Sequence, residues 1–186
     1  GFGTVEEINS LTSWVAPSYG LPWAQTSNTP FRKYKVRAYE GGISTPLILS
    51  WPDRYKQYGG QLRSNPGHII ALMATCIDVS GAAYPETFHN GQTIYPLDGR
   101  SILPAIRNPK AEIHDYIYGE HFENRFVRHG KWKAIMDEKT KVWELYDIEA
   151  DRSETRDLAG RYPEILQELI EKWQSWADSH IVYPKN

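Results

Sequence analysis

The sequence predicts a mixed α+β fold in which a four-stranded antiparallel sheet packs on a C-terminal helix. Residues 116–146 contain four short segments of strand character joined by tight connections, a pattern typical of an antiparallel meander. Residues 163–177 then place apolar side chains along one broad helical face (Ile165, Leu166, Leu169, Ile170, Trp173, Trp176 and Ala177). Because a small sheet needs at least one covered face, this helix is expected to pack on the strands.

The boundaries of these elements follow from local signals. The strands are expected at residues 116–121, 126–128, 132–135 and 142–146. Pro163 stands at a first helical position, where a missing N–H is tolerated, and so marks the start of the helix. Between the sheet and this helix, Asp151 and Glu154 have the spacing of a capping box, which predicts a short helical turn.

The rest of the chain carries weaker signals. Residues 1–31 are rich in Ser, Thr, Pro and Gly, which predicts a short helix around residues 5–13 followed by irregular loop. The apolar run at residues 47–51 predicts a buried strand. Residues 68–80 are apolar on nearly every side, which predicts a buried helix. Its Cys76 has no neighbouring cation and is expected to be a buried, unreactive core residue.

Composition sets limits on function. The 186 residues, 40% of them hydrophobic and 13% aromatic, can bury one sizeable core. A net charge of −2 argues against general nucleic-acid binding, and no apolar run approaches the length of a membrane span. The single cysteine excludes an internal disulfide framework.

The most informative segment surrounds Lys35. A basic run leads into Glu40-Gly41-Gly42 and then into the predicted strand, and loops beside strands are where α/β enzymes place their chemistry. The two glycines are expected to allow backbone angles or a close approach that a Cβ would forbid. Glu40 is expected to pair with local amides or a cation, so all three residues are interpreted as scaffold. From spacing alone, Lys35 and its neighbour Arg37 would belong to a solvated basic run.

This segment resembles the C-terminal signature of the sulfatases, which are relatives of alkaline phosphatase. The resemblance consists of a lysine, four residues, Glu-Gly-Gly, and a proline before a strand that ends in Trp-Pro. It continues in Ser-Asn-Thr-Pro-Phe-Arg at residues 27–32, in Asp-Gly-Arg-Ser-Ile-Leu-Pro at 98–104, and in the Leu-Tyr-Asp to Leu-Ala stretch at 145–159. It implies that residues 1–110 are the C-terminal remainder of an alkaline-phosphatase-like α/β domain, and that residues 111–186 form the sheet and helix subdomain.

The resemblance also implies an activity. The full-length protein is expected to hydrolyse aryl or carbohydrate sulfate esters with a formylglycine nucleophile and calcium. Lys35 takes the place of the sulfate-contacting lysine, and a compact ammonium suits charge that develops on sulfuryl oxygens. Periplasmic, secreted or lysosomal localisation is what the family suggests.

The sequence does not contain the family's other catalytic residues. The Cys/Ser-x-Pro-x-Arg nucleophile motif and the acidic calcium ligands are not found, and the chain begins with Gly1 rather than Met. It is therefore expected to be the C-terminal part of a longer sulfatase, with no metal site and no bound cofactor of its own. Without the missing N-terminal catalytic part, this chain is predicted to be inactive.

A second group of candidate site residues lies in the first predicted hairpin. The run from Glu120 to Arg125 resembles the Glu-His-x-x-Asn-Arg sequence of many bacterial sulfatases. His121, Asn124 and Arg125 are therefore expected to contact an anionic sugar by charge-assisted hydrogen bonds. The alternative is that Asn124 makes the turn and the charges face water.

Two other functions stay open. A phosphodiester or phosphonate ester hydrolase of the same superfamily would share the fold, and the upstream nucleophile motif would help to separate it. A non-catalytic carbohydrate-binding or interaction module would use an exposed face of the sheet with stacked Trp and Tyr.

Overall fold

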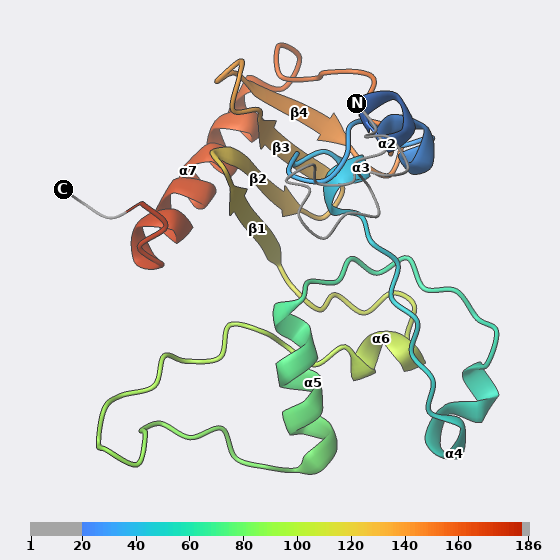
Figure 1. Ribbon diagram of the computed structural model, residues 1–186, viewed down its shortest axis with the longest axis vertical. Coiled ribbons are helices and arrows are strands. Elements are labelled where there is room, and N and C mark those ends of the chain that lie inside the picture. Colours follow the sequence, from blue (N-terminus) through green and yellow to red (C-terminus); the bar gives the residue numbers. More distant parts are fainter. Residues whose placement is uncertain (1–19, 184–186) are drawn as a thin grey trace, which may run out of the picture. The chain divides into compact units, whose positions relative to one another are not determined.

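The computed structural model describes residues 20–183 (Figure 1). Within that range the chain forms two compact units. One contains the described residues up to Pro46 and those from Tyr118 onward, and the other is Leu47–Ile117. The helix predicted at residues 5–13 lies outside the described residues. The boundary at residue 110 concerns the architecture of a whole sulfatase and stays a prediction.

The sheet of the first unit has four strands in the order β1-β2-β3-β4. The strands are β1 (Tyr116–His121), β2 (Asn124–His129), β3 (Trp132–Met136) and β4 (Trp143–Asp147). β3 pairs antiparallel with β2 and with β4. The two-residue turn between β1 and β2 has positive φ at Phe122 (47°) and Glu123 (62°), as a type I′ turn requires. The predicted antiparallel meander is confirmed.

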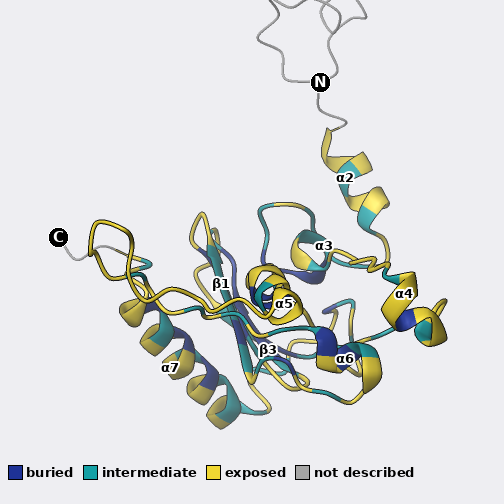
Figure 2. Ribbon diagram, turned by 90° about the horizontal axis from the view of Figure 1, so that it is seen from below, coloured by how far each residue is buried: buried dark blue, intermediate teal, exposed yellow. Residues whose placement is uncertain are grey.

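Helix α7 (Pro163–Ser179) covers one face of this sheet, as expected. Leu169, Trp173 and Ala177 are buried, and Figure 2 shows the buried side of α7 turned toward the sheet. The Trp173 indole N–H donates to the Gly119 carbonyl at 3.1 Å, and Trp176 stacks on Tyr118 with ring centroids 5.2 Å apart. The aromatic side chains on this face therefore form a seam beneath the helix rather than an open platform.

The other face of the sheet is also covered. Tyr39 and Ala38, which precede the short helix α3 (Glu40–Ile43), pack into one buried cluster with residues of the sheet. The sheet and its C-terminal extension contribute Ile135, Tyr146 and Ile148, and Phe126 packs against them. The unit thus has three layers, with the sheet between α7 and the segment around α3.

Residues 20–28 differ from the prediction of an irregular loop, because they form helix α2 (Gly20–Asn28). The polar side chains that suggested a loop are satisfied by the helix itself. Thr26, Ser27 and Asn28 each donate to the carbonyl oxygen four residues earlier, at 2.8–2.9 Å. Such back-bonding is a known alternative use of these residues within helices.

The second unit, Leu47–Ile117, is mainly helical and irregular. Its elements are α4 (Pro52–Tyr55), the 3-10 helix η1 (Lys56–Tyr58), α5 (Ile70–Ser80) and α6 (Leu103–Arg107). The buried strand predicted at residues 47–51 is wrong: the segment is not a strand, and Ile48 is 92% exposed. A strand needs a hydrogen-bonded neighbour, and the described residues of this unit supply none.

Helix α5 forms as predicted but is not buried as predicted. Only Ala71, Ala74 and Thr75 are buried, and Cys76 is exposed. Thr75 ties this side to the start of α6, since its hydroxyl accepts from the Ile102 N–H at 3.0 Å. The expectation of a buried Cys76 is therefore wrong for this chain, because the described residues cover only one side of the helix. No described helix combines the length and hydropathy that a membrane span requires.

Candidate functional site

A buried ion cluster lies beneath the segment that contains the Glu-Gly-Gly sequence. Lys133 comes from the third strand, and its side chain is 1% exposed. Its ammonium lies 2.7 Å from Glu154 Oε1 and 2.9 Å from Glu40 Oε1. The backbone N–H of Glu40 also donates to Glu154 Oε2 at 2.7 Å. The cluster therefore joins α3, β3 and the turn before α7, and Glu40 does pair with a cation.

The two carboxyl groups of the cluster have opposite pKa shifts. Burial alone would raise the pKa of Glu40, but the ammonium of Lys133 and the guanidinium of Arg152 outweigh it and hold the pKa below 4.5. For Glu154, burial dominates and raises the pKa above 4.5, although Lys133 opposes it. Two acids that share one ammonium cannot both be ionised at equal cost, which accounts for the opposite directions of the two pKa shifts.

Neither Lys133 nor Glu154 was identified from the sequence as part of this cluster. Glu154 was interpreted as a cap, but its side chain is fully buried, and the Asp151 carboxylate binds the amides of Thr155 and Arg156 instead. The usable signal was at Lys133, which shares a strand face with Ile135 in a central strand. A lysine at such a position needs a buried partner.

The two glycines after Glu40 are required by close backbone approach, as expected. A Cβ on Gly41 would lie 2.3 Å from the Arg32 carbonyl oxygen, and one on Gly42 would lie 2.0 Å from that of Arg37. The Gly41 N–H donates to the same Arg32 carbonyl at 2.9 Å. The glycines thus close residues 32–41 into a loop, which we call the Lys35 loop.

The Lys35 loop is held on both sides of Lys35. Near its start, the Arg32 guanidinium donates to the Tyr146 hydroxyl at 3.0 Å and to the Glu154 carbonyl. Between the ends, Lys33 and Val36 have φ of 65° and 86°, and a positive φ at a β-branched residue is strained. Lys35 lies between them, exposed, with no hydrogen bond or ion pair to any other described residue.

On the C-terminal side of Lys35 the loop is fixed by Arg37, which is not the exposed neighbour that the sequence suggested. Its side chain is 11% exposed, and Nη1 lies 2.7 Å from Glu138 Oε1 and 3.5 Å from Asp137 Oδ2. The same nitrogen is 3.5 Å from Asn124 Oδ1. Arg37 therefore connects the Lys35 loop with the first hairpin.

Asn124 organises that hairpin from a buried position. Its amide donates to the carbonyls of His121 and Phe122 at 3.1 and 3.3 Å, and its Oδ1 accepts from the Glu138 N–H at 3.3 Å. The turn itself is made by Phe122 and Glu123, and the side chains of His121 and Phe122 are exposed. The structure thus brings the hairpin turn and the Lys35 loop side by side.

Arg125 lies on the other face of the sheet. Successive side chains of a strand alternate, so Asn124 and Arg125 point in opposite directions. The Arg125 guanidinium lies between the rings of Trp173 and Tyr183, at 4.7 and 4.9 Å from their centroids. The structure therefore connects the Lys35 loop with Asn124 through Arg37, and leaves Arg125 at the seam beneath α7. Residues 20–183 contain no group of three His, Cys, Asp or Glu side chains that could hold a metal ion.

Comparison with known proteins identifies the family. The family described as N-sulphoglucosamine sulphohydrolase, C-terminal, matches residues 31–178, which include both the Lys35 loop and the hairpin. The chain belongs to this sulfatase family. The resemblance drawn from the Glu-Gly-Gly sequence is thereby confirmed, and the chain is a C-terminal part of a sulfatase.

Several sulfatases are similar over most of the chain. An uncharacterized sulfatase of Schizosaccharomyces pombe is 29% identical over 176 residues, which are 91% of this chain and 31% of that protein. An N-acetylgalactosamine-6-O-sulfatase of Bacteroides thetaiotaomicron is 26% identical over 162 residues, covering 78% of this chain and 29% of its own length. The chain therefore spans less than a third of these relatives.

A solved structure agrees with the fold. The crystal structure of Ps i-CgsB in complex with k-i-k-neocarrahexaose superposes with a TM-score of 0.66 at 25% identity. The match covers 80% of this chain and 32% of that one. The α+β arrangement described above is thus that of the C-terminal portion of the alkaline-phosphatase-like sulfatases.

Proposed function

We propose that the whole protein hydrolyses sulfate esters of carbohydrates, and that Lys35 contacts the sulfate group. Membership of the sulfatase family supports the reaction. The choice of a carbohydrate is supported by the similar N-acetylgalactosamine-6-O-sulfatase and by the similar structure in complex with k-i-k-neocarrahexaose.

The observation that carries the proposal is the state of Lys35 within its loop. The loop is anchored on both sides of Lys35, through Arg32 and Arg37, while the Lys35 ammonium has no partner among the described residues. The backbone that carries Lys35 is therefore fixed, while its ammonium is free to bind an anion and to stabilise charge that develops on it. Its three donors can serve sulfuryl and ester oxygens without requiring a planar geometry.

The hairpin beside the loop supplies the second part of the proposed pocket. In this proposal the exposed His121 contacts hydroxyl or sulfate groups of the sugar, and the buried Asn124 holds the turn and the Arg37 anchor. Arg125 was expected beside them, but its place between two aromatic rings suits a structural role.

The remaining chemistry is assigned to the rest of the full-length protein. The described residues of this chain do not fit a calcium ion, so calcium and the formylglycine nucleophile belong to that part, where they supply attack on sulfur and polarisation of the sulfate. The exposed apolar residues of α5 and of residues 47–51 are covered by the same part. In this arrangement residues 1–110 complete its α/β domain.

A substrate panel tests the proposal. The full-length protein should release sulfate from a sulfated monosaccharide and from an aryl sulfate, and it should act far more slowly on a phosphodiester and a phosphonate ester. The 186-residue chain alone should release none, because its sequence lacks the nucleophile motif and the family's acidic calcium ligands. A preference for the phosphorus esters would favour the related phosphodiester or phosphonate hydrolase instead. Turnover by the chain alone would contradict the assignment of the nucleophile and calcium to the rest of the full-length protein.

A further inference from the structure

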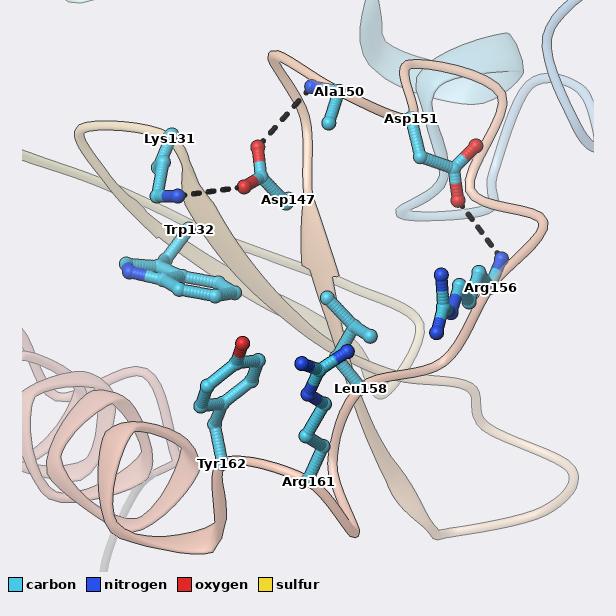
Figure 3. A pocket seen from close by; sticks show the side chains of 9 residues that line it. All are labelled: Lys131, Trp132, Asp147, Ala150, Asp151, Arg156, Leu158, Arg161 and Tyr162. Atoms are coloured by element: carbon cyan, nitrogen blue, oxygen red, sulfur yellow. Dashed lines mark hydrogen bonds and ion pairs between the residues drawn. The ribbon is translucent and has the colours of Figure 1, made fainter.

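A pocket of about 230 Å³ lies beside the turn between β2 and β3 (Figure 3). Its wall is made by the side chains of Trp132, Tyr162 and Leu158. The rings of Trp132 and Tyr162 are 5.1 Å apart and tilted by 58°, and Figure 3 shows the Tyr162 hydroxyl pointing toward Trp132. This volume is smaller than most drug-sized sites and suits a single sugar residue.

The two acidic groups of the pocket already have hydrogen-bond partners. Asp147 accepts from the Lys131 ammonium at 2.8 Å and from the Ala150 N–H at 3.1 Å. The Asp151 carboxylate accepts from the backbone N–H groups of Thr155 and Arg156, both at 2.8 Å. Asp147 is thus neutralised by Lys131, whereas Asp151 is oriented by backbone amides and keeps its charge.

The arginines of the pocket are not paired. The guanidinium groups of Arg156 and Arg161 form no ion pair or hydrogen bond with another described residue, and both side chains are exposed. In Figure 3 the Arg161 guanidinium projects beside Tyr162 into the pocket. Two forked donors next to an aromatic wall match a sugar that carries sulfate or carboxylate groups, since guanidinium groups bind such groups bidentately.

The pocket is separate from the Lys35 site. It lies at the Trp132 end of β3, whereas Arg37, Asn124 and Glu138 meet beyond the Met136 end. A strand rises about 3.3 Å per residue, so the four steps from Trp132 to Met136 put roughly 13 Å between the two ends.

We infer that this pocket is a second binding site, which holds an anionic sugar residue of an oligosaccharide or polysaccharide away from the scissile sulfate. The choice of a sugar rests on the proposed function, whereas the choice of an anion rests on the two unpaired arginines. A ligand held at both sites would gain affinity from the second contact, and a small ester would not.

The test compares two charge-matched variants of the full-length protein. Arg156→Gln with Arg161→Gln removes both arginines, and Lys110→Gln with Lys139→Gln removes two exposed lysines outside the pocket. Titration calorimetry with a sulfated oligosaccharide and with its unsulfated counterpart gives the Kd for each protein. Turnover of an aryl sulfate is measured in parallel, with Tm as the check on folding.

The arginine variant should bind the sulfated oligosaccharide about tenfold more weakly or worse, because charge-assisted hydrogen bonds are lost. Its aryl sulfate turnover, its Tm and the weak binding of the unsulfated sugar should not change. An unchanged Kd, or an equal loss in the variant that lacks Lys110 and Lys139, would overturn the inference.

If the protein binds the sugar through these arginines but releases no sulfate from any ester, the proposed function fails and the second site stands. If the double glutamine substitution lowers Tm, the same comparison is made with Arg156→Lys and Arg161→Lys, which keep the charge but lose the forked guanidinium donors. An unchanged Kd in the lysine-substituted variant would then reject bidentate recognition.

Discussion

The backbone N–H of Glu40 donates a hydrogen bond of 2.7 Å to the carboxylate of Glu154, 114 residues later in the chain. This contact fixes the residue that precedes the two glycines of the Lys35 loop, and Lys133 binds both carboxylates from below. The stability of the sheet unit and the geometry of the candidate site therefore depend on the same buried cluster.

Lys133→Met should strongly destabilise the chain. Removing one partner of a buried ion pair typically lowers the free energy of unfolding by about 3–5 kcal/mol, and here two carboxylates would lose their cation. Lys131→Met is the matched control, because Lys131 is 47% exposed in its pair with Asp147, and such surface pairs contribute little to stability. Urea unfolding followed by tryptophan fluorescence measures both. Similar losses in the two variants would show that the buried cluster has no special role.

Gly41→Ala should disturb the Lys35 loop, because the added Cβ would meet backbone atoms of Arg32, which cannot move independently. We expect a loss of roughly 2 kcal/mol or more in unfolding free energy, comparable to overpacking in a core. Gly67→Ala is the control, since its Cβ would meet nothing within 4 Å and its φ is not positive. Equal stability of the two variants would mean that the close approach at Gly41 is not rigid.

The two buried acids should shape the pH dependence of stability in opposite ways. The folded-state pKa of Glu40 is below 4.5, so its contribution is complete above that pH and is lost as the pH falls through the folded value. The folded-state pKa of Glu154 is above 4.5, so its contribution is complete below that pH and is lost as the pH rises through the folded value.

Glutamine variants separate the two contributions. Relative to the parent, Glu40→Gln should lose less stability on acidification, and Glu154→Gln should lose less as the pH rises from acid toward neutral. Unfolding free energies measured from pH 3 to pH 7 provide the comparison. Changes of the same sign in both variants would contradict the assignment of opposite shifts.

Cys76 should react quickly with a thiol reagent in the folded chain, because it is exposed on α5. In the full-length protein the same labelling should be slow until denaturant is added, since we propose that the rest of the sulfatase covers this helix. Fast labelling in both proteins would show that α5 stays uncovered.

The sheet and the last helix could be predicted because their signals are local. Pro163 and the apolar spacing after it located α7, and the short links between strands gave the meander. Residues 47–51 and Cys76 were predicted wrongly because their burial does not depend on local signals alone. Their apolar character indicates burial, but burial needs partners, and the described chain does not supply them.

The buried cluster could not be assembled from local patterns. Lys133 and Glu154 come from segments 93 and 114 residues beyond Glu40, and no local spacing connects them. Lys35 could be singled out only by the sulfatase resemblance, because its immediate sequence looks like any basic run. A basic run is not uniformly solvated, however. Arg37 belongs to the same run, and its side chain forms ion pairs with Asp137 and Glu138 that anchor the loop.

The most direct test of the account is the turnover of a sulfate ester by full-length Lys35→Ala beside Lys139→Ala. Lys139 is exposed, and its ammonium has no partner among the described residues. Losing a donor that stabilises charge in the transition state lowers kcat by about 10²–10³-fold, whereas an exposed cation has little effect. Circular dichroism checks that both variants fold. We predict a loss of that size for Lys35→Ala and near-parental turnover for Lys139→Ala. Equal turnover in the two folded variants would contradict the central role of Lys35.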